Sequence, residues 1–323
     1  MRVAVTGASG FIGRRVVEHL QAAGYDVLAF GRRPRSQLEG PQTAPYTAWD
    51  ITSGKLDRPP TAEAVVHCAA KVADWGPADE FRAVNVQGTR AVLATFPNAR
   101  FIHISTASVY PTNGIAPHRE DDRLPTRYRG AYSGTKRTAE RLVMGQGEAT
   151  VVLRPHAVYG PGDLTLLPRL LRGYRHEFLF AIGDGKNRIS LTHVDNLVHG
   201  VEQALRHPAA SGVFNIADAE AVSVDTLLRD LLKALDLRPS IRYIPRPVAL
   251  AIAGTQEVVS RIAPFSGPPL FTRYAVEQMT GNGVLDITRA VSQLEFRPAR
   301  SHGEAFAEIA ASRQGRRFRP GAG

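Results

Sequence analysis

The chain has 323 residues, of which 43% are hydrophobic and 22% charged, enough for roughly two domains with an ordinary core. Its single cysteine, Cys68, excludes an internal disulfide. The net charge of +10 raises the question of nucleic acid, but the basic residues are scattered among acids, so we expect a basic solvated surface and no nucleic-acid partner. With no transmembrane segment or signal peptide evident, we expect a cytoplasmic protein.

Short β-branched runs alternate with helical patterns through the first half of the chain. This alternation predicts a parallel sheet that is covered by helices on both faces. In chain order, we expect strands at residues 3–6, 27–30, 44–49, 64–68, 101–105 and 151–153, and helices at residues 11–23, 79–96 and 132–144.

Beyond about Leu164 the pattern becomes mixed, which predicts a second, smaller unit. We place the first domain at residues 1–165 and the second at 166–312, with the two interleaved as the alternative. A basic, flexible tail follows at residues 313–323. Expected elements of the second unit are helices near residues 194–206, 224–235 and 269–279 and a short strand at 213–216.

A glycine-rich segment lies between the first predicted strand and the first predicted helix. Gly7 permits a tight turn, Gly10 lets the backbone approach a pyrophosphate, and Gly13 lets the helix pack closely on the strand. The start of the helix presents free N–H groups and its positive dipole end to the phosphates. We therefore predict a dinucleotide-binding loop, with a plain strand–turn–helix as the alternative. The loop residues are Gly7, Ser9, Gly10, Phe11, Ile12 and Gly13.

The end of the second predicted strand indicates which dinucleotide binds. A chain that binds NAD would carry Asp or Glu at this point, which hydrogen-bonds the ribose 2′-hydroxyl. Instead the sequence has Arg32 and Arg33, whose guanidinium groups suit a 2′-phosphate. We expect NADP(H), with NAD(H) as the alternative and Arg32 favoured over Arg33. Solvated loop arginines are the competing interpretation.

Tyr132 and Lys136 are four residues apart, so on a helix both side chains face the same way. They follow a predicted strand that runs into residues 105–110. A free tyrosine titrates near pH 10, so exchanging protons near neutrality requires a nearby cation that stabilises the phenolate. Lys136, one turn away, is placed to supply that charge.

In these motifs the chain resembles the extended short-chain dehydrogenases/reductases, also called the NAD-dependent epimerase/dehydratase family. The resemblance covers most of the chain and implies an α/β fold: a Rossmann-type doubly wound parallel sheet that binds the dinucleotide, with a smaller C-terminal substrate-binding α/β domain. Besides the loop and the Tyr132/Lys136 pair, it rests on residues 50–51, 67–70, 85–89, 105–110, 153–155 and 159–162.

The resemblance implies a Ser/Thr–Tyr–Lys triad, with Thr106 as the hydroxyl member and Ser105 as the fallback. Tyr132 would exchange a proton with a carbonyl oxygen as hydride is transferred, and Thr106 would orient that oxygen. Lys136 would also bind the nicotinamide ribose. The resemblance implies further contacts with the cofactor. Asp50 and Ile51 would lie at its adenine, and Pro155 and Val158 at its nicotinamide. Ala69, Ala70 and Lys71 would approach the middle of the cofactor. A solvated loop position is the alternative for Lys71.

Two regions indicate the branch of the family. Nucleotide-sugar members usually carry an arginine at the position of Ile189, whereas Arg188 is displaced by one residue, which would reverse its direction on a strand. Other segments resemble the 3β-hydroxysteroid dehydrogenase-like branch, which includes reductases of 2-alkyl-3-oxoalkanoic acids. These segments are residues 69–76, 160–163, 183–187 and 267–273.

The apolar residues of 247–262 predict ordinary core packing, with a lining of the substrate pocket or a membrane surface as alternatives. The histidines lack the spacing of metal ligands, and we expect no metal. We expect His67, His103, His156 and His193 to be packed or hydrogen-bonded.

Three classes of function follow. The first is an NAD(P)-dependent oxidoreductase that interconverts a ketone and a secondary alcohol on an apolar small molecule, either a 3-keto acid or a steroid-like compound. The second is a nucleotide-sugar epimerase or dehydratase that holds NAD tightly. The third, a non-catalytic dinucleotide sensor, is disfavoured by the intact triad. The resemblance also implies a homodimer.

Overall fold

The structure is a computed structural model that describes residues 1–38, 44–112, 117–147, 150–163, 165–175, 177–262 and 268–312. The predicted basic tail, residues 313–323, and Gly267 of the matching segment lie outside the described residues.

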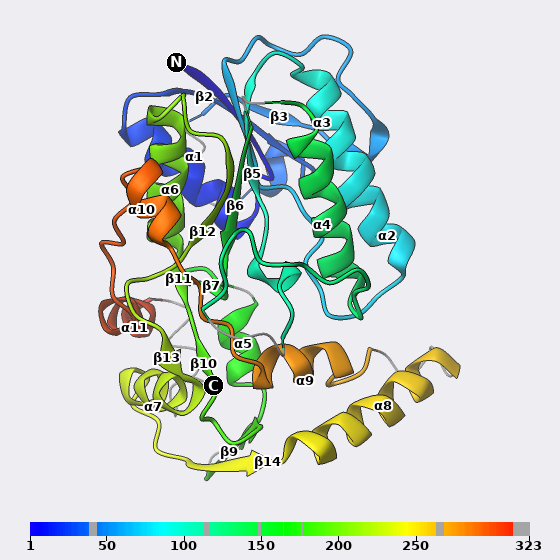
Figure 1. Ribbon diagram of the computed structural model, residues 1–323, viewed down its shortest axis with the longest axis vertical. Coiled ribbons are helices and arrows are strands. Elements are labelled where there is room, and N and C mark those ends of the chain that lie inside the picture. Colours follow the sequence, from blue (N-terminus) through cyan, green and yellow to red (C-terminus); the bar gives the residue numbers. More distant parts are fainter. Residues whose placement is uncertain are drawn as a thin grey trace.

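A seven-stranded sheet forms the centre of the molecule (Figure 1). Its strand order is β12-β6-β5-β4-β1-β2-β3, and every neighbouring pair is parallel. The predicted parallel sheet is thus confirmed. Its strands are β1 (Arg2–Thr6), β2 (Asp26–Gly31), β3 (Tyr46–Ala48), β4 (Ala64–His67), β5 (Arg100–Ile104), β6 (Thr150–Pro155) and β12 (Gly212–Ile216).

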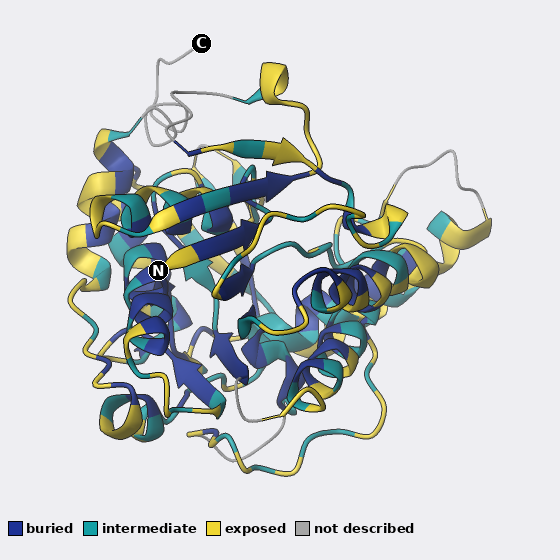
Figure 2. Ribbon diagram, turned by 90° about the horizontal axis from the view of Figure 1, so that it is seen from above, coloured by how far each residue is buried: buried dark blue, intermediate teal, exposed yellow. Residues whose placement is uncertain are grey.

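Helices cover both faces of this sheet, and the buried residues concentrate between the layers (Figure 2). On one face, α1 (Phe11–Ala22), α6 (Val194–Arg206) and α10 (Thr288–Gln293) share an apolar core with the strands. On the other face, α3 (Thr89–Thr95) and α4 (Ala131–Met144) pack in a second core. The doubly wound arrangement leaves the carboxyl ends of the strands free for a ligand.

Helix α4 buries polar residues on the face that packs against the sheet. Its buried positions include Ser133, Lys136, Glu140 and Val143, at the spacing of three and four residues that defines one side of a helix. Lys136 and Glu140 therefore enter the interior because of their place in the helical repeat, and the interior must supply them with partners.

The helix predicted at residues 79–96 forms without a gap over residues 78–95 and contains a π-helical turn. Residues 79–96 form α2 (Ala78–Arg82), a π-helical turn (Ala83–Gly88) and α3. Asn85 in the π turn is buried, and its amide bonds both backbone groups of Lys71, at 2.8 Å and 3.1 Å. Such turns are frequent at functional sites, and this one braces the segment that follows β4.

The second half of the chain adds small sheets and helices beyond the carboxyl end of the main sheet, but β12 returns and pairs with β6. The domain division at residues 165/166 stays a prediction. The remaining strands are β7 (Val158–Tyr159), β8 (Tyr174–Arg175), β9 (Phe178–Ile182), β10 (Arg188–Ile189), β11 (Thr192–His193), β13 (Val222–Ser223) and β14 (Ser240–Ile244). The remaining helices are α5 (Leu166–Leu170), α7 (Val224–Ala234), α8 (Arg246–Ile262), α9 (Arg273–Thr280) and α11 (His302–Ala311).

Core packing along residues 247–262 was the wrong expectation. Helix α8 buries small or polar positions, namely Ala249, Ala253 and Glu257. Its larger apolar side chains, apart from the partly buried Leu250, are exposed, because they lie on the opposite side of the helix: Val248, Ile252, Val258, Val259 and Ile262. Across the described residues, no helix combines the length and apolarity that crossing a membrane requires.

Helix α9 also begins later than predicted, at Arg273 instead of residue 269. Thr272 is its N-cap and accepts a hydrogen bond from the Ala275 N–H. The prolines at 268 and 269 precede this cap and stay outside the helix.

Candidate active site

The glycine loop lies where β1 and β4 end side by side. Gly7 has a φ of +70°, and a Cβ there would lie 2.7 Å from the Ala69 nitrogen. A Cβ on Gly13 would lie 2.2 Å from the Gly7 carbonyl oxygen. Both positions require glycine, because the turn and the first helix approach the neighbouring backbone this closely.

A groove of about 630 Å³ opens in front of this loop. The loop residues Ser9, Gly10 and Phe11 line it together with Arg33. Arg33 also donates a hydrogen bond to the Ser9 carbonyl, whereas Arg32 is not part of the lining. A helix start and guanidinium groups suit the phosphates of a dinucleotide, so these residues fit a nicotinamide cofactor.

The other residues predicted at the cofactor have distinct surroundings. Asp50 accepts hydrogen bonds from Thr52, which lower the pKa of its carboxyl group, and Ile51 is buried. The Lys71 ammonium is held 2.6 Å from Glu80, so this cation is engaged on α2. Ala69 and Ala70 follow β4 with intermediate exposure, while Pro155 ends β6 and Val158 begins β7.

The structure brings Thr106 and Tyr132 together. The two side chains are close enough for Thr106 to lower the pKa of the Tyr132 phenol, and Thr106 follows directly after β5 and Ser105. The Thr106 hydroxyl donates to Ser108 Oγ, at 3.1 Å. The Ser105 hydroxyl instead donates to Glu140, at 2.7 Å, and is buried. Of the two candidate hydroxyl groups, Thr106 is therefore the one beside the phenol.

Lys136 is buried beneath this pair and bonds two groups of strand β5. Its Nζ lies 2.6 Å from the Ile104 carbonyl oxygen and 3.0 Å from His103 Nε2. An ammonium has only donors, so His103 accepts on Nε2 and carries its proton on Nδ1. That Nδ1 has no partner among the residues described. Burial lowers the pKa of Lys136 to about 8, and the nearby Glu140 partly opposes this.

The pKa of the Tyr132 phenol is raised above its ordinary value. Burial is the main cause, the nearby Tyr274 adds to it, and the Thr106 hydroxyl opposes it. Lys136 is not among the groups that set this pKa, so its expected effect on the ionisation of the phenol stays a prediction. The phenol stays protonated at neutral pH, which is the form that donates a proton.

A buried ion pair supports the triad from below. The Arg154 guanidinium contacts both Glu140 oxygens, at 2.8 Å and 2.9 Å, and both side chains are almost completely buried. Glu140 also accepts from Ser105 and from Arg137. These bonds lower the pKa of the Glu140 carboxyl group despite its burial, because they favour the charged form.

A cavity of about 150 Å³ lies beside Tyr132; we call it the apolar cavity. Most of its lining is apolar and comes from the second half of the chain. Its lining residues include Val72, Ala157, Leu166, Leu170, Ile189, Val224, Leu227 and Met279. Drug-sized ligands are usually held by linings of this kind.

Sequence reasoning missed two hydroxyl groups of this cavity. The Tyr274 hydroxyl lies 3.0 Å from Ser133 Oγ, and Ser108 is close enough to lower the pKa of this phenol. Ser108 falls within the matched residues 105–110, and Tyr274 directly follows the matched segment 267–273. Their positions in or beside matched segments were a signal for both residues. No short-range sequence pattern, however, predicts that Tyr274 lies close to Tyr132.

Each of the four histidines makes a hydrogen bond, which confirms that they are packed or hydrogen-bonded. His67 bonds Thr6 and Thr89, and His156 Nδ1 lies 2.6 Å from the Ser190 carbonyl. Nδ1 of His193 caps α6. Within the described ranges, no group of three or more potential ligand side chains is placed to hold a metal.

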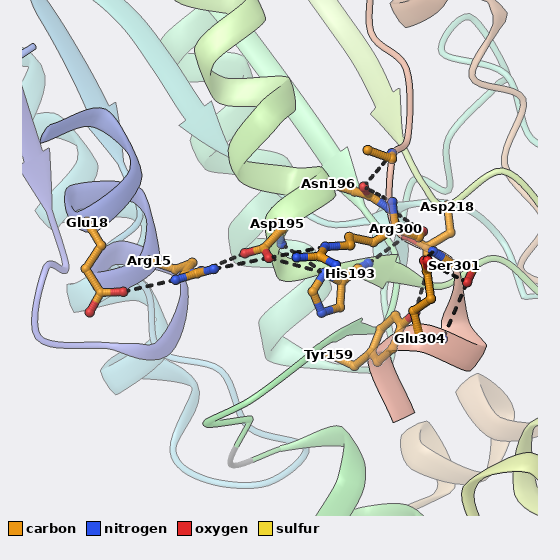
Figure 3. A network of polar contacts seen from close by, with 11 residues as sticks. Arg15, Glu18, Tyr159, His193, Asp195, Asn196, Asp218, Arg300, Ser301 and Glu304 are labelled. Atoms are coloured by element: carbon orange, nitrogen blue, oxygen red, sulfur yellow. Dashed lines mark hydrogen bonds and ion pairs between the residues drawn. The ribbon is translucent and has the colours of Figure 1, made fainter. Parts of the chain in front are cut away.

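A polar network ties the cofactor groove to the second half of the chain (Figure 3). Arg15 on α1 pairs with Asp195 at the start of α6, at 2.6 Å and 3.1 Å, and Arg300 lies 3.9 Å from the same carboxylate. The next residue, Asn196, donates to Asp218 at 2.7 Å. Because Arg15 and Asp195 both line the groove, this network connects its two walls.

The parallel sheet, the glycine loop at its strand ends and the adjoining groove define a nicotinamide-dinucleotide-binding enzyme with a Rossmann-type fold. Residues 3–217 match the family described as the NAD dependent epimerase/dehydratase family, and the chain belongs to this family. Within it, the chain is an enzyme of the extended short-chain dehydrogenase/reductase type.

Three relatives place the chain more closely. It is 31% identical to the 2-alkyl-3-oxoalkanoate reductase of Stenotrophomonas maltophilia (strain K279a), over 86% of this chain and 89% of that protein. It is 30% identical to the 3-beta-hydroxysteroid dehydrogenase of Mycolicibacterium neoaurum, over 95% and 90%. The solved structure of MoeE5 in complex with UDP-glucuronic acid and NAD has a TM-score of 0.72 at 26% identity, over 95% and 97%.

Proposed function

We propose that the chain is an NADP(H)-dependent oxidoreductase that interconverts a ketone and a secondary alcohol on an apolar substrate, a 3-keto acid or a steroid-like compound. The observation that carries this proposal is the apolar cavity beside Tyr132. Ile189, at the position where nucleotide-sugar members usually carry an arginine, lines that cavity, whereas Arg188 is exposed. Both named reductase and dehydrogenase relatives fit this substrate class.

Each residue of the triad has a role in this reaction. When bound, the cofactor supplies or accepts a hydride. Tyr132, protonated at neutral pH, donates its proton to the carbonyl oxygen in the direction of reduction. Thr106, whose hydroxyl lies beside the phenol, orients the same oxygen. Lys136, held by Ile104 and His103, keeps a positive charge beneath the site.

We expect kcat/KM to fall as the pH rises through about 8, because Lys136 then loses its charge. The sign for stability is opposite. The pKa of this lysine is about 8 in the folded chain and 10.5 when unperturbed, so the unfolded chain binds more protons between these values and this group makes stability rise with pH. A pH–rate profile, with an unfolding curve at each pH, separates the two. A flat profile from pH 7 to about 9.5 would contradict the role of Lys136.

We expect Arg33→Ala to raise KM for NADPH by about tenfold while KM for NADH stays within about twofold, because a charge-assisted bond to the 2′-phosphate contributes about 1.5–3 kcal/mol. Arg33 contacts the glycine loop and lines the groove. Arg32→Ala is the matched variant, and a larger loss there would assign the phosphate to Arg32. A wild-type enzyme that prefers NADH would overturn the choice of NADP(H).

A nucleotide-sugar epimerase or dehydratase is the second candidate, favoured by the likeness to MoeE5 bound to UDP-glucuronic acid. Purified protein with NADPH and a panel of β-keto acids, steroid ketones and sugar nucleotides distinguishes the two through nicotinamide absorbance. Net oxidation of NADPH with a keto acid or a steroid ketone supports the oxidoreductase. Conversion of a sugar nucleotide without net redox change supports the epimerase.

A further inference from the structure

A second cavity adjoins the apolar cavity and differs from it in charge. It measures about 360 Å³, and Asp74 and Tyr274 line both cavities. Three guanidinium groups line this second cavity, from Arg129 before α4, Arg261 at the end of α8 and Arg273 at the start of α9. We call it the arginine cavity.

The carboxylates around the arginine cavity are already engaged. Glu257 is buried and holds Arg273 through its backbone N–H, at 2.7 Å, and through its guanidinium, at 2.8 Å and 2.9 Å. Asp74 pairs with Arg169 at 2.9 Å, on the side of the apolar cavity. Neither acid is therefore available to neutralise the remaining arginines.

Arg261 is the cation of this cavity that lacks a carboxylate partner within the described part of the chain. Its guanidinium carbon lies 5.5 Å from the centre of the Trp75 ring, which also lines the cavity. Contact with an aromatic face holds a guanidinium in place. Its five N–H donors lie in the plane of the guanidinium group and stay free for a ligand. Arg129 contacts Glu277 through Nε at 3.3 Å, so its terminal nitrogens also remain available.

Size supports the use of both cavities by one ligand. Pockets for drug-sized molecules usually measure about 300–1,000 Å³. The apolar cavity, at about 150 Å³, lies below this range, and the adjoining arginine cavity brings the site into it. A molecule that fills both would place an apolar part beside Tyr132 and an anionic part near Arg261.

We propose that the arginine cavity binds an anionic group of the substrate, a carboxylate or a phosphate, while the ketone end of the same molecule lies at Tyr132. This inference rests on the proposed function and narrows its substrate class to molecules whose anionic group lies away from the ketone, such as steroid-like acids or 3-keto acyl groups on a phosphate-bearing carrier. A free 3-keto acid, whose carboxylate is two bonds from the ketone carbon, would not span both cavities. Arg261 is the principal anchor, and Arg129 adds a second positive charge at the same wall.

Binding to the full-length protein tests this without turnover. Isothermal titration calorimetry measures the dissociation constants of decanoate, decanoyl-coenzyme A and 1-decanol, which share an alkyl chain. We expect Arg261→Gln to weaken anionic probes about tenfold, because it removes charge-assisted hydrogen bonds, and to leave 1-decanol within about twofold. A loss confined to decanoate assigns the site to a carboxylate, and a loss confined to decanoyl-coenzyme A assigns it to a phosphate.

Two further variants complete the design. Arg238→Gln removes the same charge from a side chain that is 91% exposed and lines neither cavity, so binding should not change. Arg261→Lys keeps the charge and should retain part of the affinity. Equal weakening of 1-decanol, unchanged anion binding in Arg261→Gln, or no anion binding by the wild type would each overturn the proposal. Turnover of a ketone panel is scored separately, so a protein that binds anions through Arg261 but reduces no ketone would disprove only the proposed function.

Discussion

Tyr132→Phe is expected to lower kcat about 10²–10⁴-fold while the folded structure and cofactor binding are retained. The change removes the hydroxyl that donates the proton to the carbonyl oxygen, and general acid catalysis typically contributes a factor of this size. The aromatic ring stays, so the packing of the half-buried side chain is preserved. Steady-state kinetics with NADPH and the best ketone substrate measure the loss.

Tyr274→Phe is the matched control for this prediction. It removes a second phenolic hydroxyl from the same cavity, one that bonds Ser133. Loss of one such hydrogen bond costs about 0.5–1.5 kcal/mol, so kcat should fall about tenfold at most. Near-normal turnover of Tyr132→Phe would remove this residue from the mechanism, and a larger loss in Tyr274→Phe would transfer the donor role to Tyr274.

Arg154→Met is expected to lower the free energy of unfolding by about 3–5 kcal/mol, because it leaves the Glu140 carboxylate buried without its bidentate partner. Glu140 is 0% exposed and Arg154 is 1% exposed, so solvent does not replace the lost contacts. Urea unfolding followed by circular dichroism measures the effect. The smaller remaining stability should also reduce activity at raised temperature.

Arg82→Met tests whether burial is the reason why Arg154→Met lowers the free energy of unfolding. Arg82 pairs with Asp79 at 3.1 Å, but both side chains are largely exposed, and such pairs contribute about 0–1 kcal/mol. An equal loss in the two variants would contradict the argument from burial. The pH dependence has a defined sign: the lowered pKa of Glu140 contributes stability above its ordinary pKa of 4.5, and this contribution is lost as the pH falls through the lowered value.

Local patterns were sufficient for most of the central sheet. The expected helix at residues 194–206 has the bounds of α6, because apolar residues at helical spacing mark one face and arginine ends the last turn. The glycine loop was equally readable, since Gly13 is required by the backbone of Gly7, six residues earlier, and Gly7 by its own positive φ. The environment of residues 247–262 was misjudged because periodicity reports that a helix has an apolar side but not what that side meets, and the π turn within the helix at 79–96 leaves no mark in that periodicity.

The family, the fold class and the candidate triad follow from the order of the residues, because they depend on turn chemistry, helical spacing and the order of short motifs. The surroundings of those residues depend on how the chain packs in three dimensions. This packing brought Tyr274 to Ser133, placed His103 beneath Lys136, and put Arg33 rather than Arg32 in the groove. Contacts between residues far apart in the chain are selected by packing and by the need to pair every buried polar group, and neither is encoded in a local pattern.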